Sequence, residues 1–128
     1  MLTVIRPIGV ASMNSYSDEQ KKICLKFGAD YFPCDDYMMV GISRNFDPTD
    51  YPINELRHPV EEDSTGWYIW SSESFSEEPD FFVSLHAIHV QEGRCPEIVK
   101  YLGLAPGWRF LIAPGWEDVW FDPKLLMI

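Results

Sequence analysis

The chain has 128 residues and a formal net charge of −10, and 46% of its residues are hydrophobic and 15% aromatic. This length fits one domain, spanning residues 1–128, and so much apolar content excludes a disordered chain. The negative charge disfavours nucleic acid as a partner, because proteins bind phosphate backbones largely through Lys and Arg, and it favours a basic protein instead. A negative surface can also serve solubility alone, and that alternative stays open.

The cysteines and the N-terminal residues indicate where in the cell the protein resides. Cys24, Cys34 and Cys95 are odd in number and lack C-x-x-C spacing, so we expect reduced thiols in a reducing environment. The first ten residues lack the basic region of a signal peptide, and no run approaches the roughly eighteen apolar residues of a membrane span. We therefore expect a cytoplasmic protein that does not bind membranes.

A helix is the best-marked element of the N-terminal half. Ser17 and Gln20 have the spacing of a capping box, acidic residues follow in the first turn, and Gly28 is a typical stop. Upstream, residues 2–5 form a short strand candidate. The capping signals predict a helix over residues 18–27, and its buried side is expected to carry Ile23, Cys24 and Phe27.

Two strands and two loops are expected in the middle of the chain. Residues 37–44 alternate at period two and predict a strand, as does the aromatic run at residues 66–71. Between them, residues 45–65 are rich in Pro, Asp and Asn and predict a long surface loop, with at most a turn of helix at residues 53–58. An acidic loop follows at residues 71–80.

Of the next two segments, the first has an ambiguous secondary structure and the second is clearly marked as a helix. Residues 81–90 are ambiguous, because their apolar spacing fits a helix while their β-branched and aromatic content favours a strand, which we prefer. Pro96 at a first helical position and Gly103 after the end frame a short helix. Its inward side chains are expected to be Ile98, Val99 and Leu102.

The C-terminal segment holds the tetrapeptide Ala-Pro-Gly-Trp twice, at residues 105–108 and 113–116. Pro presets φ at the first central position of a β-turn and Gly accepts the positive φ of the second, so each Pro-Gly pair predicts a reversal. The apolar runs on either side of Pro114-Gly115 then predict a β-hairpin that pairs residues 108–113 with residues 117–122.

These elements together predict one fold class. About six strands and two short helices, without βαβ alternation, predict an α+β domain. We expect a mostly antiparallel sheet that ends in a C-terminal β-hairpin.

Signatures of catalysis or metal binding are weak. His86 and His89 form H-x-x-H, which on a helix could share a metal ion, but no further ligand stands at a recognised interval. Cys95 precedes a helix, where a thiol can be activated, although a buried small residue explains that position better. No cofactor motif occurs, so we expect no metal, no cofactor and no enzyme activity. A small hydrolase that uses the two histidines and a carboxylate is the minor alternative.

Exposed aromatic and acidic residues are the candidates for contact with a partner. Trp116 follows the Pro114-Gly115 turn directly and precedes acidic residues, and aromatic side chains among charges are typical interface anchors. An isolated exposed Trp also occurs without any function. The partner-binding candidates are therefore Trp116, Glu117, Asp118 and Asp122 near the hairpin, and Glu61, Glu62, Asp63, Glu77 and Glu78 in two acidic loops.

A family resemblance covers about residues 66–126. In order, this region contains GWYIWSSES, PDFF, LHAIHV, PEIVKYLGLAPGWRFLIAPGWEDVWFD and a closing LL. It resembles the bacterial immunity protein family numbered thirty-three, formerly a domain of unknown function. The GWRFL and EDVWFD blocks are the most specific parts, and the first sixty-five residues resemble nothing comparable.

The resemblance implies a function but no catalytic residues. A member of this family would be a small cytoplasmic protein encoded beside a polymorphic toxin, which protects its producer by binding that toxin and blocking the toxin's active site. The partner would then be a cognate toxin, which the charge of this chain suggests to be basic. A general protein-interaction module with another partner is the alternative.

Overall fold

The protein is described here from a computed structural model covering residues 8–72, 75–76 and 78–127, so the strand expected at residues 2–5 lies outside the described residues. The helices are α1 Ile8–Phe27, α2 Ala87–His89, the π-helical η2 Val90–Arg94, α3 Pro96–Val99 and the 3-10 helix η3 Pro123–Leu126. The strands are β1 Met39–Ser43, β2 Ile53–Arg57, β3 Ser64–Ser71, β4 Phe82–His86, β5 Trp108–Ala113 and β6 Trp116–Phe121.

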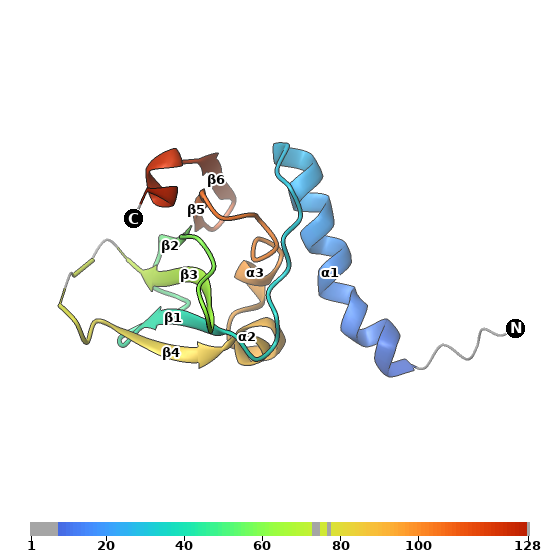
Figure 1. Ribbon diagram of the computed structural model, residues 1–128, viewed down its shortest axis with the longest axis horizontal. Helices are drawn as coiled ribbons and strands as arrows, with labels where there is room; N and C mark the ends of the chain where they lie inside the picture. Colours follow the sequence, from blue (N-terminus) through green and yellow to red (C-terminus); the bar gives the residue numbers. More distant parts are fainter. Residues whose placement is uncertain (1–7, 73–74, 77, 128) are drawn as a thin grey trace, which may run out of the picture.

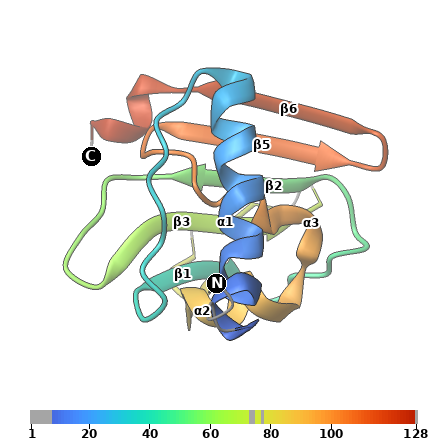
Figure 2. The ribbon, with the colours of Figure 1, turned by 90° about the vertical axis from the view of Figure 1, so that its right-hand side faces the viewer.

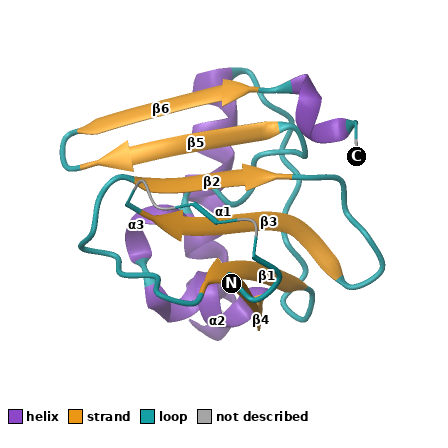
Figure 3. Ribbon diagram, turned by 90° about the vertical axis from the view of Figure 1, so that its left-hand side faces the viewer, coloured by secondary structure: helices purple, strands orange, loops and turns teal. Residues whose placement is uncertain are grey.

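The strands form one six-stranded sheet in the order β4-β1-β3-β2-β5-β6. Among these described strands, β1 and β3 run parallel and the other neighbouring pairs are antiparallel. The helices α1, α2 and α3 lie together on one face of this sheet (Figures 1 and 2). No helix of the described residues forms a layer on the opposite face, which we call the open face (Figure 3). The predicted α+β class with a mostly antiparallel sheet is confirmed.

The core fills the space between the sheet and the helices. Side chains alternate across a strand, so every second residue of the inner strands points toward the helices. Trp67 is fully buried there, and its indole Nε1 donates a hydrogen bond to the Leu102 carbonyl at 3.1 Å. The other apolar strand residues with this orientation and full or nearly full burial are Val40, Ile42, Ile53, Ile69, Phe110 and Ile112.

The helix α1 is longer than the capping signal predicts. It begins at Ile8, whereas the capping box placed its start at Asp18, and it ends at Phe27 as expected. Gln20 is fully buried and its Nε2 donates to the Val99 carbonyl at 2.8 Å and to Gln91 Oε1 at 3.1 Å. The predicted start was wrong because Gln20 bonds to distant residues across the core, which outweighs its use as a local cap.

The strand β2 corrects the prediction of a turn of helix at residues 53–58. It is a central strand, paired with β3 on one side and β5 on the other. Its inward side chains are Ile53, Glu55 and Arg57, so two of the three buried positions are charged types and the usual apolar alternation is hidden. The long surface loop predicted at residues 45–65 is thus two loops with a buried strand between them.

The contacts of Arg57 explain how its charged side chain fits a buried position of β2. Its Nε donates to the Thr65 carbonyl at 2.8 Å, and its Nη1 donates to the carbonyls of Phe32 and Leu104 at 2.7 and 2.8 Å. The guanidinium also lies 5.0 Å from the Phe32 ring centroid and 5.3 Å from the Trp67 ring centroid. Arg57 therefore ties the segment after α1 to the sheet through carbonyl groups and aromatic rings.

The ambiguous segment at residues 81–90 contains both structures. Its first half is β4, which pairs with β1, and its second half is α2 and the start of η2. The expected helix after Pro96 is present as α3, and Ile98, Val99 and Leu102 are buried as predicted.

The predicted C-terminal hairpin is confirmed. Strands β5 and β6 pair without a register shift from Trp108↔Phe121 to Ala113↔Trp116, around the Pro114-Gly115 turn. Gly107 and Gly115 have φ values of +98° and +71°, the left-handed region that the second position of a type II turn requires. The second strand of the hairpin begins at Trp116, one residue before its expected start at Glu117.

Candidate partner-binding surface

Successive side chains of β6 point to opposite faces of the sheet. Trp116 and Asp118 lie on the open face and are exposed, and 52% of the Trp116 surface is accessible. Glu117 lies between them in sequence and therefore points to the helical side. Trp116 and Asp118 thus lie on one side of β6, and Glu117 points to the other.

Glu117 has partners of its own on the helical side. It accepts hydrogen bonds from Lys26 Nζ of α1 and from the Tyr101 hydroxyl. These two donors hold the pKa of Glu117 below its ordinary value, while burial together with Glu117 raises the pKa of Tyr101. The carboxylate therefore fixes the hairpin to α1, which keeps the backbone beneath Trp116 in a defined position.

A groove lies beside the tip of the hairpin. It has a volume of about 510 Å³ and runs between α3 and the turn at Pro114 and Gly115. Its lining includes Trp116 and Glu117 from the hairpin and Lys100 from the α3 side. The groove mixes both signs of charge with aromatic and apolar surface, which suits contact with a protein side chain.

The acidic loops lie at opposite ends of the sheet. Ile53 pairs with both Ser71 and Ile112, so the loop after β3 and the hairpin tip share one end. Glu78 in that loop is exposed, and Glu77 lies outside the described residues. At the other end, the turn between β2 and β3 carries three exposed carboxylates, Glu61, Glu62 and Asp63. A compact partner surface at one end would therefore use only one of these loops.

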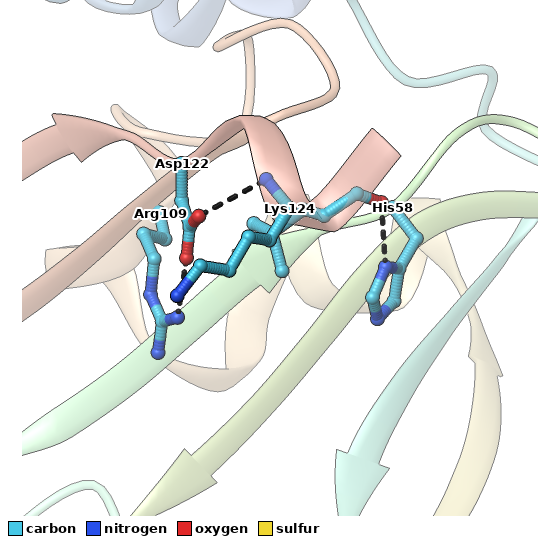
Figure 4. A network of polar contacts seen from close by, with 5 residues as sticks. His58, Arg109, Asp122 and Lys124 are labelled. Carbon is cyan, nitrogen blue, oxygen red and sulfur yellow. Dashed lines mark hydrogen bonds and ion pairs between the residues drawn. The ribbon is translucent and has the colours of Figure 1, made fainter. Parts of the chain in front are cut away.

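Asp122 belongs to a polar network with Arg109 and Lys124 (Figure 4), and the strand pairings place it at the end of the sheet that holds the Glu61–Asp63 turn. It pairs with Arg109 at 3.1 Å, and its other oxygen accepts the backbone N–H of Lys124 at 3.1 Å, which caps η3. His58 Nδ1 lies 3.0 Å from the Leu125 carbonyl. Asp122 thus serves to hold the C-terminal segment against the sheet.

The open face also carries an aromatic cluster that the sequence did not reveal. We define the cluster as Tyr68, Trp70, Phe75, Phe81 and Phe82. The Phe75 ring centroid lies 5.1 Å from Trp70 and 5.8 Å from Phe81, and 51% of Phe75 is exposed. One signal was available, because GWYIWS is apolar at both alternating positions, and a strand apolar on both faces needs a use for its second face.

The comparison with protein families decides the assignment. The Imm33-like domain matches residues 19–122 of this chain. The chain belongs to the Imm33-like domain family. The match begins well before the resemblance at residues 66–126 and takes in residues 19–27 of α1 and the strands β1 and β2. No match was found to a curated protein or to a solved structure.

The two histidines of this Imm33-like protein do not share one helix face. His86 ends β4 and His89 lies in α2, and their ring centroids are 6.1 Å apart. His86 instead packs edge-on against Tyr37 at 6.2 Å. Among the residues that the structure describes, no three His, Cys, Asp or Glu side chains gather in a way that could hold a metal ion.

The three cysteines are free thiols. Cys95 is buried, and burial raises its pKa, so it fits the expected structural role at the start of α3. Burial likewise raises the pKa of Cys34, to about 11. A raised pKa lowers the thiolate fraction, which is the reactive form. Within the described part of the chain, no helix combines the length and the apolar character needed to cross a membrane.

Proposed function

We propose that this Imm33-like protein is a cytoplasmic immunity protein that binds a cognate toxin of its producer and occludes the toxin's active site. Membership of the family carries this proposal. The exposed Trp116 on a helix-free face of the sheet supports it, because a large aromatic side chain held on a rigid element is a typical interface anchor.

The hairpin gives Trp116 the properties that an anchor needs. The paired strands β5 and β6 and the Glu117 contacts to Lys26 and Tyr101 fix the backbone, so little conformational entropy is lost when the side chain is buried by a partner. Asp118, two residues along on the same face, supplies a charged rim. The net charge of −10 would accelerate encounter with a basic toxin.

The test compares protection with binding. The toxin encoded by the neighbouring gene is expressed with and without this protein to measure growth, and a catalytically inactive toxin is titrated calorimetrically. Wild-type protein should restore growth, and Trp116→Ala should weaken binding by about 2 kcal/mol, or roughly 30-fold. Leu25→Ala is the matched control, because Leu25 is 83% exposed on α1, on the helical side.

Two outcomes would count against parts of the proposal. Failure of the wild-type protein to protect cells or to bind the toxin would overturn the function itself. Unchanged affinity in folded Trp116→Ala would leave the function standing and remove the hairpin tip as its site. Changes at Glu61, Glu62 and Asp63 would then test the opposite end of the sheet.

A further inference from the structure

The aromatic cluster presents an apolar surface to solvent. Phe75 packs against Trp70 and Phe81, at the distances given above, and lies 6.3 Å from Phe82. Phe81 and Phe82 meet edge-to-face at 4.9 Å. Three neighbouring rings thus hold Phe75 in place although half of its own surface is accessible. Phe75 is the exposed member of the cluster, and an exposed ring held in place by less exposed rings is typical of an interface anchor.

Exposed carboxylates border this cluster. Asp47 and Asp50 lie beside the end of β3, since the Asp47 N–H donates to Ser71 Oγ at 3.0 Å and the Ser72 N–H donates to the Asp50 carbonyl at 2.9 Å. Glu78 and Asp80 line a groove of about 300 Å³ together with Phe81. Among the described residues, none of these four carboxylates forms an ion pair.

The positive charges are mostly elsewhere. Four lysines belong to the helical layer, in α1 or directly after α3: Lys21, Lys22, Lys26 and Lys100. Among the described residues that line the groove the cation is Arg44, whose Nε donates to the backbone carbonyl of Asp80 at 3.0 Å. The groove therefore combines aromatic surface with carboxylates that one cation does not balance.

We propose that the aromatic cluster and the carboxylates Glu78 and Asp80 form a second contact surface that receives an Arg or Lys side chain of the toxin. This inference rests on the proposed function and names the chemistry of the partner. The charged end of the side chain pairs with the carboxylates, and its planar or aliphatic part lies on the Phe75 and Phe81 rings, whose faces attract cations.

Charge favours a basic side chain over the other possible occupants of this surface. A second copy of the chain would bring another net −10 to the interface, and a nucleic acid would bring phosphates to the same carboxylates. A basic protein segment is the macromolecular partner that gains from both the aromatic rings and the acidic border. The bound side chain of this segment would lie at the same end of the sheet as Trp116, so one partner can contact both surfaces.

The experiment measures association and dissociation rates of the inactive toxin across a salt series. Phe75→Ala should raise Kd about tenfold or more, mainly through faster dissociation, and Phe75→Leu should lose most of the same affinity because it keeps apolar packing but removes the ring. The double change Glu78→Gln, Asp80→Asn should slow association severalfold and flatten its salt dependence. The charge-matched control is Asp18→Asn, Glu92→Gln, at two exposed positions in the helical layer.

The outcomes separate this inference from the proposed function. If wild-type protein binds the toxin while the Phe75 variants and the double variant behave like the control, the inference fails and the function stands. If wild-type protein does not bind the toxin at all, both fail. Full affinity of Phe75→Leu with loss in Phe75→Ala would show that the ring serves packing only and would overturn the cation site. Sedimentation showing a dimer that Phe75→Ala dissociates would assign the surface to self-association and overturn it too.

Discussion

A buried carboxyl group in the core makes folding stability depend on pH. Glu55, in the central strand β2, is 1% exposed, and neither of its side-chain oxygens has a hydrogen-bond partner among the described residues. Burial raises its pKa well above the ordinary value of 4.5. Glu55 is therefore protonated in the folded protein at pH values where the unfolded chain has already lost the proton.

The sign and size of the effect follow from this difference. As pH rises above 4.5, the unfolded state is stabilised by releasing the Glu55 proton, so the free energy of unfolding falls. One proton corresponds to a slope of about 1.4 kcal/mol per pH unit, and the fall stops once pH exceeds the raised pKa. Below 4.5 both states hold the proton, and Glu55 adds no pH dependence.

The assay is urea unfolding at several pH values between 5 and 8, for wild type and Glu55→Gln. The amide does not titrate, so the variant should gain on wild type by up to about 1.4 kcal/mol for each unit of rising pH. Glu55→Leu should be more stable than wild type by about 1–3 kcal/mol near neutral pH, because it removes an unpaired buried polar group. Glu62→Gln, at an exposed position, should follow wild type. Parallel curves for wild type and Glu55→Gln would refute the reasoning.

Further predictions concern the backbone and the thiols. Gly66→Ala should destabilise the fold by about 3 kcal/mol or more in urea unfolding, because φ is +90° and a Cβ atom would lie 2.0 Å from the His58 carbonyl oxygen. Gly93→Ala has no atom within 4 Å of the new Cβ and should change stability by less than about 1 kcal/mol; equal losses in the two variants would contradict the steric argument. The three free cysteines should react slowly with a disulfide reagent at pH 8 in the folded protein and fully in denaturant, and rapid labelling of Cys34 would contradict its raised pKa of about 11.

Local chemistry explains what the sequence could predict about the fold. The Pro114-Gly115 turn and Pro96 at the start of α3 act within a few residues, so the hairpin and the short helix follow from neighbouring residues alone. β2 was missed because its inward positions hold Glu55 and Arg57, two charged types that a local pattern assigns to the surface, and Arg57 is satisfied by the distant carbonyls of Phe32 and Leu104. For the same reason Gln20 was taken for a cap, although its hydrogen bonds reach Gln91 and Val99 across the core.

The candidate surface was predictable in one part only. Exposure of Trp116 follows from its place after a turn, and the structure agrees. Glu117 points to the other side of β6 because adjacent residues on a strand face opposite sides, although it lines the groove beside the hairpin tip together with Trp116. The aromatic cluster required knowledge that β4 and β3 both flank β1, which brings Phe82 within 5.1 Å of Tyr68, and no local pattern reports that pairing.

The position of α1 has a consequence for how the protein is made. Gln20 bonds to residues 71 and 79 positions further along the chain, and Lys26 to one 91 positions further. A ribosome therefore releases this helix long before it has synthesised the groups that the helix packs against. Until then Ile23 and Cys24 remain without the groups that bury them in the folded protein. Closure of the core is thus a late event, set by the arrival of η2, α3 and the hairpin.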